Sequence, residues 1–418
     1  MPDLLTLLLI ALAICGLLSV VLEEVIHVNK SQSVLFFGAL AWLLLFGFAH
    51  SEPGATERVK EGLQENIGEI AGLWLFLLAA MTFVVYLNQK GMIETLIYKM
   101  LPSKVSERGL LLIAGMFAFV FSSLADNITA TLISVSLVLS LKLPLKKQLR
   151  FAVLLVFAVN SGGVAMITGD VTTLMIFLEG KVGIVNLLLL SIPSLAAVLV
   201  LATLLARPLK GQAFISGQQH PLHKVDFVIA GVFISTIIST LVLNVIFEVP
   251  PVLTFITGLS VMFLVARAFG EDTENTPIMN YIRQIEFDTL MFFLGILLLV
   301  GALKEVHALD SFTRIYEVLP AWAANYLMGL LSALIDNVPL TAALLKANVE
   351  MDLAEWLSFT YAVGVGGSLL IIGSAAGIVA MSKIDGLTFS TYLRYSGALI
   401  IAYTAGYAAV FMLGLMIA

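Results

Sequence analysis

The chain has 418 residues, of which 60% are apolar and only 12% are charged, and its net charge is −6. Soluble domains carry about 25% charged residues, so the composition excludes a soluble enzyme of two or three domains. It also excludes nucleic-acid binding as the main role, because the 22 Lys and Arg residues form no basic face. One cysteine, Cys15, excludes a disulfide framework and a thiolate zinc site, and five scattered histidines disfavour a His-based metal site. A polytopic membrane protein remains.

Apolar stretches of about 17–25 residues, long enough to cross a bilayer, recur along the chain. The clear candidates are 4–22, 33–49, 67–88, 184–206, 226–247, 250–268, 286–303 and 392–416. The first is predicted to be a retained span and not a signal peptide, because Met1-Pro2-Asp3 brings no positive charge and no cleavage site precedes Glu23-Glu24. The polar loops 50–66 and 206–225 are too short to fold alone.

Four further apolar stretches are unusual. Residues 109–141 and 319–346 carry Asp-Asn near their middle, while 150–179 and 356–383 are interrupted by glycine and small polar residues. Residues 89–108 are amphipathic and short, and favour an interfacial helix over an ordinary loop.

Basic residues set the expected orientation. They cluster on both sides of 109–141, at Lys90, Lys99, Lys104 and Arg108 before it and at Lys142, Lys146, Lys147 and Arg150 after it. If both clusters are cytoplasmic, 109–141 is a re-entrant hairpin, and both chain termini are then predicted to be periplasmic.

The two halves of the sequence repeat. Phe121-Ser-Ser-Leu-Ala-Asp-Asn-Ile-Thr-Ala-Thr131 matches Leu331-Ser-Ala-Leu-Ile-Asp-Asn-Val-Pro-Leu-Thr341, and Gly162-Gly163 with Gly169 matches Gly366-Gly367 with Gly373. Each half reads as three spans, a hairpin, a broken helix and a final span. Five crossings per half is an odd number, so the second half must be inverted, as in many transporters. The fold class is therefore an all-α membrane protein with an inverted repeat.

Three carboxylates, Asp126, Asp170 and Asp336, lie deep in apolar stretches. A charge at the bilayer centre costs about 2.5–3.5 kcal/mol, which favours a role in a binding site over a helix cap alone. At the hairpin turns Asn127 and Asn337 add amide oxygens, and the nearby hydroxyls are those of Thr129, Thr131 and Thr341. These are ligands that a hard cation prefers.

The glycine-rich interruptions also carry polar side chains. The first has Asn160, Ser161, Gly162, Thr168, Asp170 and Thr173, and the second has Gly366, Ser368 and Ser374. Glycine permits unwinding, and the alternative is close helix packing through small residues. The halves differ chemically, because Ser374 stands where the first half has Asp170. We therefore expect the main Na⁺ site at Asp126 and Asp170 and a second one at Asp336.

Such carboxylates suit competition between a cation and a proton, since burial disfavours an unneutralised charge. Alternating exposure would then exchange one ion for the other, which is antiport. The Na⁺:H⁺ stoichiometry does not follow from the sequence.

The motifs resemble the ion transporter superfamily, and most closely its NhaD-type sodium/proton antiporters. The two hairpin turns are similar to the Ser-Asn-Thr turns of the superfamily's symporters, with Asp replacing Ser, and Thr168-Gly-Asp-Val-Thr-Thr173 is similar to an Ile-Gly-Asp-Val-Thr-Thr segment of NhaD relatives. The chain departs from the family pattern in lacking a proline before Thr168.

The resemblance implies a homodimer in a bacterial inner membrane that exports Na⁺ or Li⁺ in exchange for H⁺, as an elevator, without a cofactor. Residues 1–88 and 225–303 would form the scaffold parts. Residues 89–210 and 304–418 would form the transport parts, with hairpins at 109–141 and 319–346.

Two other transporters of this fold stay open. A sodium-coupled organic-anion symporter is disfavoured because the aspartates at the turns repel an anion, and an arsenite-type permease is disfavoured less strongly. A membrane enzyme is the weakest alternative, since no nucleophile–base pair lies within a span. The histidines at span ends and in loops, any of which could sense pH, are His27, His50, His220, His223 and His307.

Overall fold

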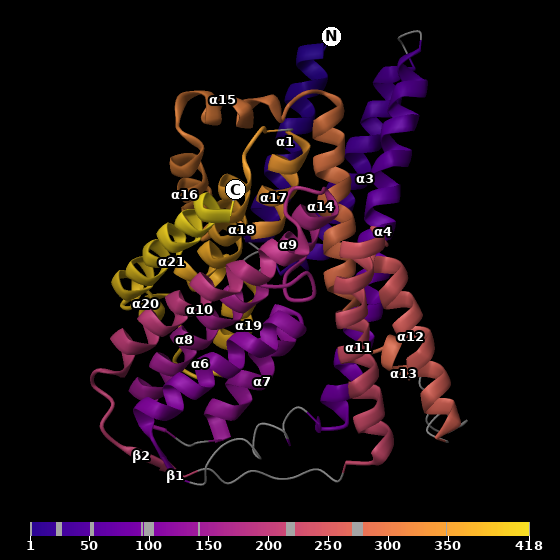
Figure 1. Cartoon of the computed structure of the whole chain (residues 1–418). Coiled ribbons are helices and arrows are strands. Elements are labelled where there is room, and N and C mark those ends of the chain that lie inside the picture. Colours follow the sequence, from indigo (N-terminus) through magenta and orange to yellow (C-terminus); the bar gives the residue numbers. More distant parts are fainter. Residues whose placement is uncertain are drawn as a thin grey trace.

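The computed structural model describes residues 2–21, 27–50, 54–92, 95, 104–140, 143–214, 222–269, 279–347 and 349–417. These parts are almost entirely helical (Figure 1). One short antiparallel pairing joins β1 (Lys104–Ser106) to β2 (Gln212–Phe214). Eight described helices are long and apolar enough to cross a membrane. The prediction of an all-α polytopic membrane protein is confirmed.

Seven of the predicted plain spans form helices close to their predicted bounds. They are α1 (Pro2–Val21), α3 (Lys30–Ala49), α10 (Ile184–Ala206), α11 (Lys224–Phe247), α12 (Pro251–Ala268), α14 (Phe287–Glu305) and α21 (Ser396–Ile417). The predicted last span began at 392, but α20 (Phe389–Leu393) is a separate short helix before α21.

The third span is much longer than predicted. Helix α4 (Ala55–Gln89) has 35 residues and is therefore about 52 Å long. The prediction that 50–66 is a loop is wrong from Ala55 onward. Ala55, Val59 and Leu63 recur at helical spacing and pack against α14, while the charges between them face away. Residues 55–66 were predicted as a loop because they are rich in charge, although their apolar residues follow a helical pattern.

Each predicted hairpin is a pair of helices joined at its Asp-Asn motif. The first pair is α6 (Glu107–Leu124) and α7 (Asn127–Ser140), and the second is α16 (Ala321–Ser332) and α17 (Asn337–Lys346). A short helix, α15 (Asp310–Val318), precedes the second pair.

The predicted interfacial helix over 89–108 is only partly described: Met92 and Thr95 are helical, and the Thr95 N–H donates to the Gly91 carbonyl oxygen at 3.0 Å. Gln89 ends α4, residues 104–106 form β1, and Glu107 begins α6. Residues 93–94 and 96–103 lie outside the described residues, as do Glu23, Glu24, Lys99, Lys142 and His220.

Both predicted broken helices are interrupted at their glycine pairs. Helix α8 (Leu145–Gly163) is followed by an irregular segment and then α9 (Val171–Leu178). Helix α18 (Leu353–Gly366) is followed by two 3₁₀ turns, η1 (Gly367–Leu369) and η2 (Ile371–Gly373), and then α19 (Ala375–Lys383). The first break forms without a proline.

Gly162 and Gly366 allow close helix crossings just before these breaks. A Cβ at Gly162 would lie 2.1 Å from the carbonyl oxygen of Phe119, and one at Gly366 would lie 2.0 Å from that of Gly329. Close packing and unwinding therefore both occur, at neighbouring residues.

The helices pack into two groups (Figure 1). The frame group consists of α1, α3, α4, α11, α12 and α14, and the hairpin group of α6 to α10 and α16 to α21. Among the described residues the main helix contact between the groups is that of α14 with α17. Any site on α17 therefore lies beside this junction.

Candidate ion-binding site

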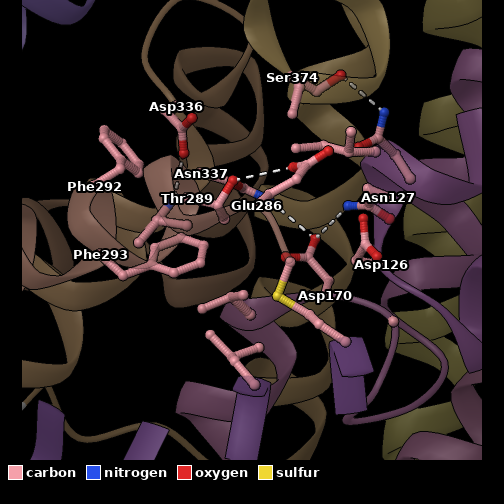
Figure 2. A pocket seen from close by; sticks show the side chains of 18 of the residues that line it. Asp126, Asn127, Asp170, Glu286, Thr289, Phe292, Phe293, Asp336, Asn337 and Ser374 are labelled. Carbon is pink, nitrogen blue, oxygen red and sulfur yellow. Dashed lines mark hydrogen bonds between the residues drawn. The ribbon is translucent and has the colours of Figure 1, made fainter. Parts of the chain in front are cut away.

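A cavity of about 90 Å³ lies at the junction of the two helix groups. The hairpin group lines it with Asp126, Asn127, Asn160, Asp170, Asp336, Asn337 and Ser374. The frame group lines it with Lys30, Glu286, Thr289, Phe292 and Phe293. Figure 2 shows these polar side chains gathered around one space. Residues expected to form two separate sites thus line one cavity.

Asp170 joins the two hairpin turns. Its Oδ2 atom accepts a hydrogen bond from Asn127 Nδ2 at 3.4 Å and from Asn337 Nδ2 at 3.1 Å. Its Oδ1 atom accepts from the backbone N–H of Thr172 at 3.1 Å and so caps α9. The side chain is buried, with an exposed fraction of 7%. One carboxylate therefore holds three chain segments together (Figure 2).

The other two aspartates also cap half-helices. Asp126 Oδ1 accepts from the backbone N–H of Thr129 and its Oδ2 from the Thr129 hydroxyl, both at 2.8 Å. Asp336 Oδ1 accepts from the backbone N–H of Val338 at 3.0 Å. Capping is thus a role of all three aspartates. A neutral Ser or Asn caps equally well, so capping does not explain the negative charges.

Asn160 brings an amide to the cavity from α8. Its Nδ2 atom donates to Ser374 Oγ at 3.0 Å and to the carbonyl oxygen of Val156 at 2.9 Å. Its Oδ1 atom is buried and has no hydrogen-bond partner among the described residues. A buried acceptor without a donor is costly, and it is an atom that a bound cation can coordinate.

Several predicted site residues do not line the cavity and instead support its walls. The hydroxyl of Thr168 donates to the carbonyl oxygen of Ser123 at 2.7 Å, and that of Thr341 to the carbonyl oxygen of Asn337 at 2.9 Å. Thr129 holds Asp126 as described above. The other predicted residues that do not line the cavity are Ser161, Gly162, Thr173, Gly366 and Ser368.

Three polar residues of the cavity, Lys30, Glu286 and Thr289, were not predicted to belong to the site. Glu286 precedes α14 as its N-cap and accepts a hydrogen bond from the Thr289 hydroxyl at 3.3 Å. Lys30, at the start of α3, places its Nζ 5.1 Å from the centre of the Phe292 ring. In the sequence both charged residues lie at span ends, where a charged side chain is usually exposed to water, so neither was assigned to the site. Only the packing of α14 against α17 turns Glu286 toward the aspartates.

The four carboxylates line different parts of the cavity and do not form a single cluster. Within the described parts of the chain, no three His, Cys, Asp or Glu side chains form a group that could hold a metal ion. The carboxylates come from separate elements, at 126, 170, 286 and 336, and amide groups stand between some of them.

A protein-family model described as citrate transporter matches residues 3–366. The chain belongs to this family. It is 33% identical to the Na⁺/H⁺ antiporter NhaD of Vibrio cholerae, over 92% of this chain and 87% of that protein. It is 31% identical to the NhaD antiporter of Alkalimonas amylolytica, over 96% and 89%, and 30% identical to sodium/proton antiporter 1 of Arabidopsis thaliana, over 94% and 70%.

These matches confirm the resemblance to NhaD-type proteins. The family is one of membrane transporters and not of enzymes. The family model and the curated relatives name different cargoes, citrate and sodium with protons.

Proposed function

We propose that the protein is a secondary antiporter that exports Na⁺, or Li⁺, in exchange for H⁺. The observation that carries this proposal is the place of Asp170, a buried carboxylate between the amides of Asn127 and Asn337. Carboxylate, amide and hydroxyl oxygens suit a hard cation. The antiporters among the relatives support the same cargo.

Exchange follows from competition for the same oxygens. The described residues that line the cavity include four carboxylates and one ammonium group, that of Lys30, so the cavity holds excess negative charge when no ion is bound. A proton or a Na⁺ ion lowers the cost of keeping these charges away from water. Binding of one ion then favours release of the other, and no cofactor is required.

The two helix groups suggest how access alternates. We assign the frame group, from residues 1–88 and 225–303, as the scaffold. The hairpin group, from 89–210 and 304–418, is the transport unit of an elevator. The same order of elements in both halves supports an inverted repeat. Movement along α14 would carry Asp126, Asp170 and Asp336 together, because all three belong to the hairpin group.

We further propose a homodimer in a bacterial inner membrane, with both termini periplasmic. The frame group offers apolar surface for such an interface on α11 and α12, where Ile246 is 63% and Leu264 is 68% exposed. A second copy and lipid are both compatible with that surface, so the dimer rests on the resemblance to the family.

Citrate is the competing cargo, as the family model is named for it. A tricarboxylate would meet Asp126, Asp170, Glu286 and Asp336 in a cavity of about 90 Å³. Like charges repel strongly in a buried site, and Lys30 is the one basic residue among the described residues that line the cavity. The chemistry of the cavity therefore favours a cation.

Everted membrane vesicles loaded with a fluorescent pH probe test the proposal. After respiration acidifies the lumen, addition of NaCl or LiCl at alkaline pH should restore the fluorescence. Vesicles with Asp170→Asn should not respond. A wild-type protein that ignores Na⁺ and Li⁺ but takes up labelled citrate would overturn the proposal.

A further inference from the structure

An ion pair connects the two helix groups at a distance from the cavity. Lys346 is the last residue of α17, in the hairpin group, and Glu69 belongs to α4, in the frame group. The Lys346 ammonium group donates to both carboxylate oxygens of Glu69. The Lys346 side chain is only 11% exposed, so its charge depends on this partner.

Lys346 has a second carboxylate within reach. Glu179, which follows α9, places its Oε1 atom 3.9 Å from the Lys346 Nζ. Helices α9 and α17 pack against each other inside the hairpin group. One ammonium group therefore stands between a carboxylate on the frame group and a carboxylate on its own group.

The two contacts respond differently to a movement between the groups. Displacement of α17 along α14 would separate Lys346 from Glu69, whereas Glu179 would travel with it. A buried ammonium group left without a counter-charge is strongly disfavoured. The contact with Glu179 lowers that cost, because Lys346 can exchange partners during the movement.

We propose that Lys346 is a positioning residue that selects the conformational state by exchanging Glu69 for Glu179. The Lys346–Glu69 pair stabilises the arrangement seen here, and the Lys346–Glu179 pair stabilises the arrangement that opens to the other side of the membrane. The inference rests on the proposed movement of the hairpin group. Helix α17 also begins with Asn337, the donor to Asp170, so one helix joins the ion pair at its end to the cavity at its start.

A neighbouring ion pair provides a matched control. Glu65, one turn before Glu69 on α4, binds Lys304 of α14 at 3.2 Å. Both partners lie in the frame group, so Glu65→Gln removes a charge from the same helix and leaves both carboxylates that contact Lys346 in place.

Cysteine accessibility measures the state directly. Cys15 is the one cysteine of the chain, so Cys15→Ser gives a cysteine-free background. Ala375 lines the cavity from the hairpin group, and Ala375→Cys provides a probe for an impermeant maleimide. Labelling rates in intact cells and in everted vesicles give the ratio of the two openings.

Glu69→Gln should shift this ratio about tenfold away from the state described here, and Glu179→Gln should shift it in the opposite direction. Glu65→Gln should leave the ratio within about twofold of the background. Lys346→Arg should preserve the ratio, because a guanidinium group can bind both carboxylates. If Glu69→Gln unfolds the protein, Glu69→Asp should give a smaller shift in the same direction.

Equal ratios in Glu69→Gln and Glu65→Gln, or shifts of the same sign in Glu69→Gln and Glu179→Gln, would overturn the proposal. Labelling requires no ion transport, so the result separates two failures. Opposite shifts in a protein without sodium antiport would refute the proposed cargo alone, and normal antiport without shifts would refute the exchange of partners.

Discussion

Asn337 donates a hydrogen bond to the carboxylate of Asp170 at 3.1 Å, although the two residues are 167 positions apart in the chain. The bond joins the second hairpin turn to the break in the first interrupted helix. Asn127 of the first half and Asn337 of the second half thus donate to the same carboxylate oxygen, Asp170 Oδ2. The chemistry of the cavity therefore depends on both halves and not on one alone.

Asp170→Asn should reduce Na⁺-driven proton movement to background. The substitution keeps the size of the side chain and removes the charge that a cation or proton would neutralise. Everted vesicles with a pH probe measure the effect. Asp352→Asn is the control, because Asp352 caps α18 through the backbone N–H of Glu355 and does not line the cavity. Full activity in Asp170→Asn would contradict its role.

Asn160→Ala should raise the apparent KM for Na⁺ about fivefold and change the maximal rate less. The substitution removes the Oδ1 atom that has no donor among the described residues, and one such interaction contributes about 1 kcal/mol. The sodium dependence of antiport at fixed pH provides the measurement. Ser374→Ala tests the alternative that only the Asn160–Ser374 hydrogen bond matters, since it breaks this bond and retains Oδ1. Equal KM values in both variants would favour that alternative.

Glu286→Gln should also raise the apparent KM for Na⁺, by about tenfold, because a carboxylate from the frame group is lost near the cavity. Turnover at saturating Na⁺ should persist, since Asp126, Asp170 and Asp336 remain on the hairpin group. Asp288→Asn is a close control, as Asp288 accepts from Asn29 at 3.2 Å outside the cavity lining. A complete loss of antiport in Glu286→Gln would show that this residue carries the exchange itself.

Gly162→Ala should lower the melting temperature in detergent and reduce antiport. Its Cβ would meet the Phe119 carbonyl oxygen at 2.1 Å, and forced overpacking costs about 1–3 kcal/mol. Gly231→Ala is the control, because no atom lies within 4 Å of a Cβ at that position in α11. It should be neutral or stabilise by up to about 1 kcal/mol. Equal melting temperatures would show that α8 can move away from α6.

The sequence singled out the chemically distinctive residues of the cavity. Two Asp-Asn motifs and a Gly-Asp motif stood out because charge and amide groups are rare in apolar stretches, and Asp126, Asp170 and Asp336 all line the cavity. Glu286 and Lys30 were missed because a charge at the end of a span is ordinary. Their place follows from the packing of α14 and α3, which no local pattern shows.

The helix boundaries were predicted less well where composition was ambiguous. Residues 55–66 are rich in charge, yet three apolar positions on one face extend α4 by three turns along α14. The hydrogen bond between Asn337 and Asp170, which joins the two halves, could not be predicted from the sequence either. The sequence placed Asp170 opposite Ser374 in the repeat, but only the fold brings Asn337 to Asp170 and Asn160 to Ser374.

The two breaks and the two hairpin turns have a common electrostatic effect. Helices α7, α9, α17 and α19 begin at Asn127, Val171, Asn337 and Ala375, all of which line the cavity. The amino end of a helix carries about half a positive elementary charge. Four such ends place a fixed positive potential around the carboxylates. This potential offsets part of their repulsion while neither ion is bound, and it limits how tightly a cation is held, so that the ion can leave once the opposite side opens.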